Sequence, residues 1–346
     1  MNYDKAEILN ILKDLLFISS PTGHTESILR HIENSLKEMN ISYKNTTKGG
    51  LIVSFPGKNN TYQRTFTSHV DTLGAMVKDI KDNGTLSLLP IGTYMMSTLE
   101  DENCTIETSN GKSYSATIHT TKPSVHISGN SANDLKRTPE NMEIILDEKV
   151  FCKNDVESLG ISVGDYILID PRTLITKKEF IKSRYLDDKA GVSAVIYTIK
   201  YLHKNNIKLP YTTNFYISTY EEVGHGSSAA LPEKTKELIS IDMGTVGCGQ
   251  TSSEYAVSIC AKDSSGPYDY SIRKKLIETC KENNIPYKVD IYPYYTSDAS
   301  AALCAGWDVK AALIGPGVFA SHAYERTHID AILATIDLII KYASKA

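Results

Sequence analysis

The sequence lacks the features that mark membrane and secreted proteins. Its 346 residues contain no apolar run near ~18 residues, the length that a membrane-spanning helix requires. The segment 1–7 mixes acidic and basic side chains, so it lacks the order of a secretory signal, in which a basic segment precedes an apolar one. We therefore expect a cytoplasmic protein with no membrane partner.

The sequence also lacks a large net charge and the cysteine spacing of a structural metal site. A net charge of -4 gives no electrostatic reason to expect a nucleic-acid partner. The six cysteines are scattered without a Cys-x-x-Cys pair, which argues against a zinc knot or a redox motif. Hydrophobic residues at 41% and charged residues at 23% are ordinary for a globular protein. The chain should fold, keep its thiols reduced and bind a small ligand.

The order of periodic segments predicts an α/β fold with a mixed central sheet flanked by helices. Five segments are expected to be helices: 4–17, 25–39, 188–204, 268–283 and 329–343. Four short segments rich in β-forming residues are expected to be strands: 51–55, 64–70, 214–220 and 237–242. Helices that alternate with strands in this way favour an α/β architecture.

Residues 73–171 differ from the rest of the chain. Short β-type segments broken by Gly, Asn and Pro occur there without a long helix: 85–89, 113–120, 143–146 and 166–169. A polar stretch at 130–140 is either a mobile or an ordered surface loop. We predict an α/β domain formed by 1–72 and 172–346, with an all-β domain inserted between them.

Histidine and acidic residues follow the strand candidates. His69 and Asp71 stand at the end of 64–70, and residues two apart in an extended chain point to one face, so the Asp71 carboxylate can orient the His69 imidazole. Asp242 ends the segment 237–242 in the same way. These positions make all three residues candidates for a site at the edge of the sheet.

Two acidic pairs add four more carboxylates. Glu221 and Glu222 follow 214–220, and because consecutive strand side chains diverge, the two can take separate tasks. Asp187 and Asp188 stand at the start of a predicted helix. Each pair could serve a shared site.

Bound metal would allow these groups to converge. His322 follows a Gly-Pro-Gly turn at 315–317 and supplies a second imidazole. Open α/β sheets place their sites at the carboxyl ends of strands, and carboxylates gathered there without cations repel one another. Two imidazoles with three carboxylates suit Zn²⁺ or Co²⁺ better than Ca²⁺ or Mg²⁺. Two such ions would keep one positive charge, which favours a bridging hydroxide as nucleophile.

Each motif alone also has an ordinary interpretation. A His-x-Asp pair is commonly a surface hydrogen bond, Asp-Asp before a helix is commonly a cap, and Glu-Glu is commonly solvated. Asp242 could be a turn residue. His225 could line the cleft, and His328 could compete with His322 as a ligand. The metal hypothesis depends on the combination of motifs.

The ordered motifs resemble the M42 family of metallo-aminopeptidases, the group that contains glutamyl and tetrahedral aminopeptidases. Three motifs match in the family's order: Ser-His-Val-Asp at 68–71, Leu-Asp-Asp-Lys-Ala-Gly at 186–191 and Tyr-Glu-Glu-Val-Gly at 220–224. Asp242 and His322 fall at the last two ligand positions, and 295–299 is similar to a Thr-Asp-Ala loop near the family's substrate cleft. The resemblance covers nearly the whole chain.

The resemblance implies two ligand sets that share one carboxylate: His69, Asp187 and Asp242 for one metal, and Asp187, Glu222 and His322 for the other. It also implies that Glu221 is the general base and that Asp71 orients His69. The segment 73–171 would correspond to the family's dimerisation domain, from which members build dimers and twelve-subunit shells. The chain departs from the family's His-Ser-x-x-Glu pattern at 322–325, where it has His-Ala-Tyr-Glu.

These features predict a di-metal aminopeptidase that removes the N-terminal residue of peptides with a free amine. A related di-metal dipeptidase, carboxypeptidase or deacylase would share the metals and the base. A non-catalytic assembly protein would lack a ligand or the base, and here none is missing. Paired carboxylates alone would permit glycoside hydrolysis, but two histidines among them fit metal-assisted hydrolysis better.

Overall fold

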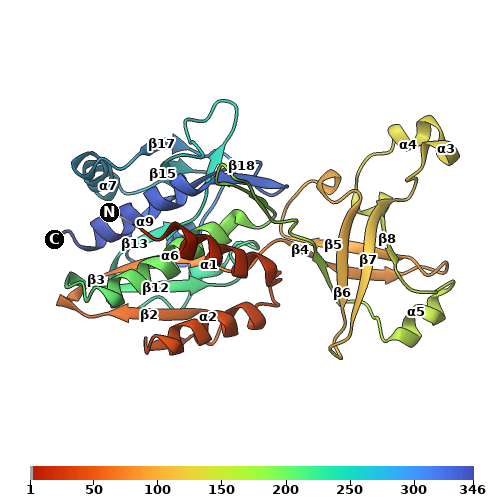
Figure 1. The fold of residues 1–346 in the computed structure, drawn as a ribbon, viewed down its shortest axis with the longest axis horizontal. Coiled ribbons are helices and arrows are strands. Elements are labelled where there is room, and N and C mark those ends of the chain that lie inside the picture. The colour runs from red at the N-terminus through yellow and green to blue at the C-terminus, as the bar shows by residue number, and fades with distance from the viewer. Residues whose placement is uncertain (1–2) are drawn as a thin grey trace. The chain divides into compact units, whose positions relative to one another are not determined.

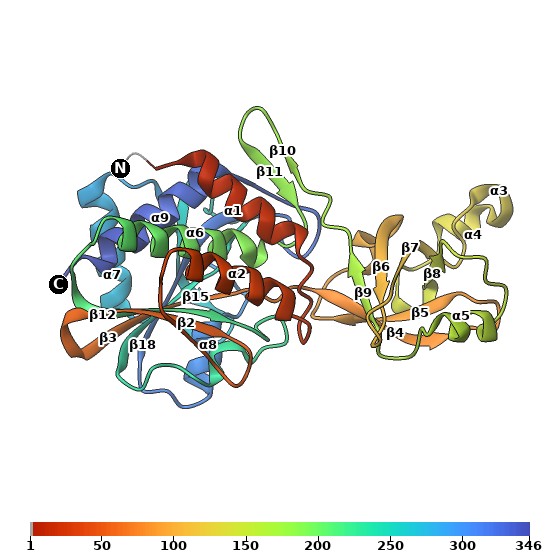
Figure 2. The same cartoon turned by 60° about the horizontal axis from the view of Figure 1, so that its bottom comes forward.

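The computed structural model describes residues 3–346, which form two compact units. One unit contains the residues up to Thr72 together with Arg172–Ala346, and the other contains Leu73–Pro171. Within the described residues, none of the helices combines the length and the apolar character needed to cross a membrane. Figures 1 and 2 show the larger unit as helices layered on a sheet and the smaller unit as a β-barrel.

The larger unit is built on a mixed sheet of 13 strands. Its main path runs β1-β2-β12-β3-β13-β18-β19-β11-β10. The bounds of these strands are Tyr43–Asn45, Leu51–Phe55, Leu209–Ser218, Gly57–His69, Thr235–Ile241, Lys310–Phe319, Glu325–His328, Phe180–Ser183 and Leu174–Ile175. Four further strands pair off this path: β14 (Gly244–Val246), β15 (Val257–Asp263), β16 (Gly266–Pro267) and β17 (Tyr287–Ile291).

Helices cover both faces of this sheet. The larger helices are α1 (Lys5–Phe17), α2 (Glu26–Glu38), α6 (Leu186–Lys204), α7 (Tyr270–Asn283) and α9 (Ile329–Ala343), and α8 (Asp298–Cys304) is shorter. Helix α1 begins where the Asp4 side chain accepts a hydrogen bond from the Glu7 N–H. It buries apolar side chains at intervals of four and three residues, which form a stripe along one side of the helix. Helices α1, α6 and α9 lie on one face of the sheet and α8 on the other (Figure 2). Helix α6 is buried on nearly every side, which explains its mostly apolar sequence.

The smaller unit is a closed barrel in the order β4-β5-β8-β7-β6-β9. Its strands, in that order, are Gly74–Ile80, Leu86–Ile91, Met142–Leu146, Ser113–Thr120, Glu102–Glu107 and Tyr166–Ile169. Inward side chains alternate with outward ones, as in β7, where Ala116, Ile118 and Thr120 are buried. Three short helices accompany the barrel: α3 (Val125–Ser128), α4 (Asn130–Asn133) and α5 (Lys153–Leu159). The polar stretch at 130–140 thus starts with a helical turn.

These features confirm the predicted fold class of a mixed α/β sheet with an additional β unit. The arrangement also explains how distant segments meet. Strands β3, β12 and β13 are adjacent and parallel, so their carboxyl ends lie at one edge of the sheet. His69 ends β3, the Glu221–Glu222 pair follows β12, and Asp242 follows β13.

Candidate metal centre

Asp187 lies between two histidines at the carboxyl edge of the sheet. Its Oδ1 atom is 3.2 Å from His69 Nε2, and its Oδ2 atom is 3.2 Å from His322 Nε2. Each carboxylate oxygen therefore faces a different imidazole. The three residues come from the end of β3, the start of α6 and the turn between β18 and β19.

Two groups of possible metal ligands share this carboxylate. In each group, one ligand atom per residue can be chosen so that the atoms all lie within 4.8 Å of one another. The groups are His69 with Asp187 and Asp242, and Asp187 with Glu222 and His322. The side chain of His322 is 36% exposed, whereas those of His69, Asp187, Glu222 and Asp242 are buried. Solvent therefore reaches the centre from the His322 side.

The two glutamates stand on a tight loop after β12. Tyr220, which precedes them, has a left-handed backbone with φ of 67°, unusual for a residue other than glycine. The N–H of Gly224 donates to the Glu221 carbonyl at 2.7 Å and closes the turn. Glu221 Oε2 lies 3.8 Å from His69 Nε2, and Glu222 Oε2 lies 3.5 Å from His322 Nε2. The adjacent carboxylates thus approach opposite ends of the centre.

Asp71 contacts His69 differently from the sequence prediction. His69 Nδ1 lies 2.9 Å from the backbone carbonyl of Asp71 but 3.7 Å from its carboxylate. The carboxylate instead accepts hydrogen bonds from Thr22 Oγ1 at 2.6 Å and from the N–H groups of Glu221 and Glu222 at 3.2 and 3.4 Å. Asp71 is therefore connected both to the histidine and to the backbone of the glutamate pair.

Burial dominates the electrostatics of the acidic groups. It raises the pKa of Glu221 and Glu222 well above their ordinary value, and it raises that of Asp242 to about 7, with repulsion from Asp187 adding to the effect. Burial opposes the charge on His69, yet the nearby carboxylates raise its pKa. Asp187 is the exception, because hydrogen bonds to His322 and His69 overcome its burial and lower its pKa. Buried carboxylates this close together repel one another when ionised, and nearby positive charge offsets this repulsion.

The donor set fits divalent cations. Two imidazole nitrogens and carboxylate oxygens are ligands that borderline ions such as Zn²⁺ and Co²⁺ accept. Glu222 Oε1 is buried and has no hydrogen-bond partner among residues 3–346, although a buried unpaired acceptor costs about 1–3 kcal/mol. A cation held between these groups would satisfy that oxygen and offset the repulsion.

Glu325 and Asp188 make supporting contacts, of which the resemblance implied only that Asp188 packs or hydrogen-bonds near the site. Glu325 accepts hydrogen bonds from the N–H groups of Asp187 at 3.1 Å and His322 at 3.0 Å, so it ties two of the possible ligands together. Ser68 donates to the Asp188 carboxylate, which is fully buried. The only signal for Glu325 was its spacing, three residues after His322, within the motif already noted.

His225 and His328, whose roles the sequence left undecided, lie apart from the ligand groups. His225 is exposed and its ring stacks on that of Tyr220, with centroids 5.1 Å apart. His328 caps α9 by accepting from the Asp330 N–H at 3.2 Å, and its Nε2 lies 2.9 Å from the Lys178 carbonyl. His328 therefore serves as a helix cap and does not compete with His322.

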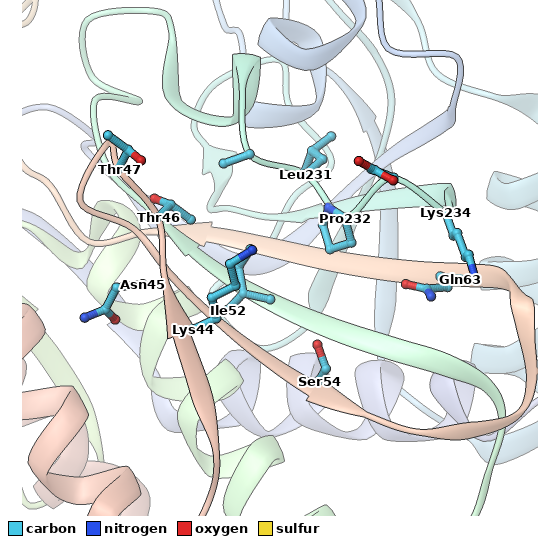
Figure 3. A pocket seen from close by; sticks show the side chains of 12 residues that line it. Lys44, Asn45, Thr46, Thr47, Ile52, Ser54, Gln63, Leu231, Pro232 and Lys234 are labelled. Atoms are coloured by element: carbon cyan, nitrogen blue, oxygen red, sulfur yellow. The ribbon is translucent and has the colours of Figure 1, made fainter.

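A separate cavity of about 580 Å³ lies on the sheet near β2 and β3 (Figure 3). It is lined by residues 44–47 and 230–234 together with Ile52, Ser54 and Gln63. None of the predicted site residues lines it. The cavity thus contributes no group to the acidic centre, although Thr46 and Thr47 of its wall belong to the same turn as Lys48.

The M42 glutamyl aminopeptidase family matches residues 49–338. The chain belongs to this family. It is 48% identical over 334 residues to YhfE of Bacillus subtilis (strain 168), a candidate aminopeptidase, with 96% of each chain covered. Members of the M42 family are metal-dependent, and the chain is a peptidase of the aminopeptidase type.

Solved structures of two archaeal peptidases share the fold. The aminopeptidase APDkam598 from the archaeon Desulfurococcus kamchatkensis has a TM-score of 0.88 at 20% identity, covering 99% of this chain and 96% of that one. The TET1 peptidase of Pyrococcus horikoshii has a TM-score of 0.86 at 22% identity, covering 98% and 100%. At these identities the likeness concerns the fold.

Proposed function

We propose that this M42 family member is a two-metal aminopeptidase that removes the N-terminal residue of peptides with a free amine. The observation that carries the proposal is the position of Asp187, whose two oxygens each lie 3.2 Å from a different imidazole. A carboxylate in this position can bridge two cations.

The ligand roles follow from the two groups of possible ligands. His69, Asp187 and Asp242 would hold one ion, and Asp187, Glu222 and His322 would hold the other. Zn²⁺ and Co²⁺ suit these donors. When bound, such ions polarise a peptide carbonyl and lower the pKa of water.

Glu221 is the general base in this proposal. Its carboxylate is beside His69 but belongs to neither ligand group, so it is available to move a proton. Burial raises its pKa, which makes it a stronger base than an exposed glutamate. Glu221 would take a proton from the attacking water and deliver it to the departing amine. Asp71 would hold Glu221 in place through the backbone N–H.

The chain would act as a homo-oligomer, a dimer or a dodecamer, through its barrel unit. Large apolar side chains are exposed there, including Ile127 at 88% and Phe151 at 79%. The TET1 peptidase of Pyrococcus horikoshii, which shares the fold, can assemble into a tetrahedron or a large octahedral shell. We also propose that the protein is cytoplasmic and that its substrates are peptides.

A substrate panel combined with metal removal tests this function. Matched short peptides would carry a free N-terminus, an acetylated N-terminus or an amidated C-terminus. An aminopeptidase cleaves the free-amine and C-amidated peptides and spares the acetylated one, whereas a carboxypeptidase requires the free C-terminus and a deacylase attacks the acetylated peptide. Exhaustive chelation should abolish cleavage, and Zn²⁺ or Co²⁺ should restore it. Full activity in verified metal-free protein would overturn the proposal.

A further inference from the structure

Lys48 contacts the loop that carries Glu221 and Glu222. Its ammonium group donates to the carbonyl oxygens of His225 and Gly226, the latter at 2.7 Å, and it lies 3.4 Å from Ser228 Oγ. None of these acceptors is a metal-ligand candidate. All three acceptors lie in the later part of the loop, a few residues after the glutamate pair.

The backbone of Lys48 is fixed as well. Lys48 lies in the turn between β1 and β2, where the N–H of Thr46 donates to the Gly50 carbonyl at 2.8 Å. A Cβ atom at Gly50 would lie 2.5 Å from the Tyr216 ring of β12, so only glycine lets the turn approach so closely. The Lys48 carbonyl in turn accepts from Thr219 Oγ1 at 3.0 Å. Lys48 therefore bonds to both ends of the segment 219–228.

Other contacts hold the same segment. Asp71 accepts from the N–H of Glu221, and Asp298 accepts from the N–H of Ser227 at 2.8 Å. Both of these acidic side chains bind N–H groups. Lys48 supplies the complementary restraint, because it is a cation and binds carbonyl oxygens. Lys48 also lies over the Tyr220 ring, 5.8 Å from its centroid.

We propose that Lys48 is a positioning residue of the metal centre, which fixes the loop 219–228 and thereby the directions of Glu221 and Glu222. Contacts behind a metal ligand typically change metal affinity about 10- to 100-fold. A shift of 1 Å in a reacting group can lower the rate about 100-fold. The role rests on the proposed two-metal function, but the restraint on the loop does not depend on bound metal.

The position of Lys48 makes the expected loss selective. Glu222 belongs to only one of the two ligand groups, and the other group contains no residue of the loop 219–228. Loss of the Lys48 contacts should therefore lower the affinity for one ion and leave the affinity for the other unchanged. A general loss of stability would lower both affinities.

The test compares Lys48→Met with Lys48→Arg and with a matched control, Lys44→Met. Methionine has a similar length but cannot donate, arginine can still donate to carbonyl oxygens, and Lys44 is an exposed lysine of β1. Stepwise Zn²⁺ affinities come from competition with a chelating fluorophore. Hydrogen exchange at the amides of Gly224 and His225 reports on the loop in metal-free protein.

Lys48→Met should lower the affinity for one Zn²⁺ ion about 10- to 100-fold, leave the affinity for the other unchanged and speed hydrogen exchange in the loop. Lys48→Arg should show intermediate values, and Lys44→Met should behave like wild type. The proposal would be overturned if Lys48→Met kept both wild-type Zn²⁺ affinities and the wild-type exchange rate. It would also be overturned if the affinities for both ions fell equally. If Lys48→Met does not fold, Lys48→Arg and Ser228→Ala decide by the same criteria. A wild-type protein that binds fewer than two ions would instead refute the proposed function, and the exchange measurement would still test the restraint.

Discussion

The carboxylate of Asp71 accepts a hydrogen bond from the backbone N–H of Glu221 at 3.2 Å. Its backbone carbonyl lies 2.9 Å from His69 Nδ1. One residue thus connects the first histidine of the centre with the loop of the paired glutamates. Asp71 is fully buried, and Thr22 Oγ1 supplies a further hydrogen bond to its carboxylate.

Asp71→Ala should weaken metal binding about 10- to 100-fold, because the N–H groups of Glu221 and Glu222 lose a common acceptor. Asp71→Asn keeps one acceptor oxygen and should fall between the alanine variant and wild type. Calorimetric Zn²⁺ titration of the three proteins measures the difference. Thr22→Val, which removes only the hydroxyl donor, serves as the milder control. Wild-type affinity in Asp71→Ala would contradict the role assigned to this carboxylate.

The metal-free protein should become less stable as pH rises from about 4.5 to 7. Burial raises the pKa of Asp242 to about 7 and raises those of Glu221 and Glu222 above 4.5. A carboxyl group with a higher pKa in the folded state binds more protons folded than unfolded, so the free energy of unfolding falls through this window. Urea denaturation of chelated protein at both ends of the window measures the change.

The Zn²⁺-loaded protein provides the comparison for this pH effect. Bound cations would replace the protons, so its stability should not fall in the same way. Asp242→Asn removes one titrating carboxyl group and should flatten the decline in metal-free protein. A metal-free protein that gains stability between pH 4.5 and 7 would show that these groups ionise normally in the fold.

Much of the fold could be predicted because its segments carry local periodicity. The segment 329–343 coincides with α9, and 51–55 coincides with β2. Both bury a regular set of apolar side chains, which the sequence reveals directly. The carboxyl ends of the parallel strands then indicated where histidines and carboxylates would gather.

Other features depend on contacts that sequence patterns do not encode. Strand β3 begins at Gly57, seven residues before the predicted start at 64, and its first part is mostly exposed, so no buried pattern marks it. It is held by pairing with β12. Lys48 contacts backbone atoms of a distant segment, and nothing in its own neighbourhood distinguishes it from a surface lysine. For Glu325 the spacing from His322 was a signal, but the spacing did not reveal the hydrogen bond from the distant N–H of Asp187. The ligand assignment itself stays a prediction.

Exposed apolar side chains of the barrel unit should mediate self-association. Replacing Ile127 and Phe151 by lysine places charge where an interface would bury apolar surface, so the double variant should sediment as a smaller species than wild type. Phe17→Lys, at a phenylalanine 60% exposed in the other unit, is the control. An unchanged sedimentation coefficient in the double variant would locate the interface elsewhere.

Glu221 and Glu222 should fail in different ways when each is changed to glutamine. Glu221→Gln should keep both metals and near-normal substrate affinity while kcat falls about 10²- to 10⁴-fold, because only proton transfer is lost. Glu222→Gln should weaken one metal, since Glu222 belongs to the group with Asp187 and His322. Metal analysis beside steady-state kinetics distinguishes the two variants. If Glu221→Gln loses metal while Glu222→Gln retains it, the two roles must be exchanged. If both variants stay fully active, the chemistry takes place at another site, because neither a base nor a ligand of this centre would then be required.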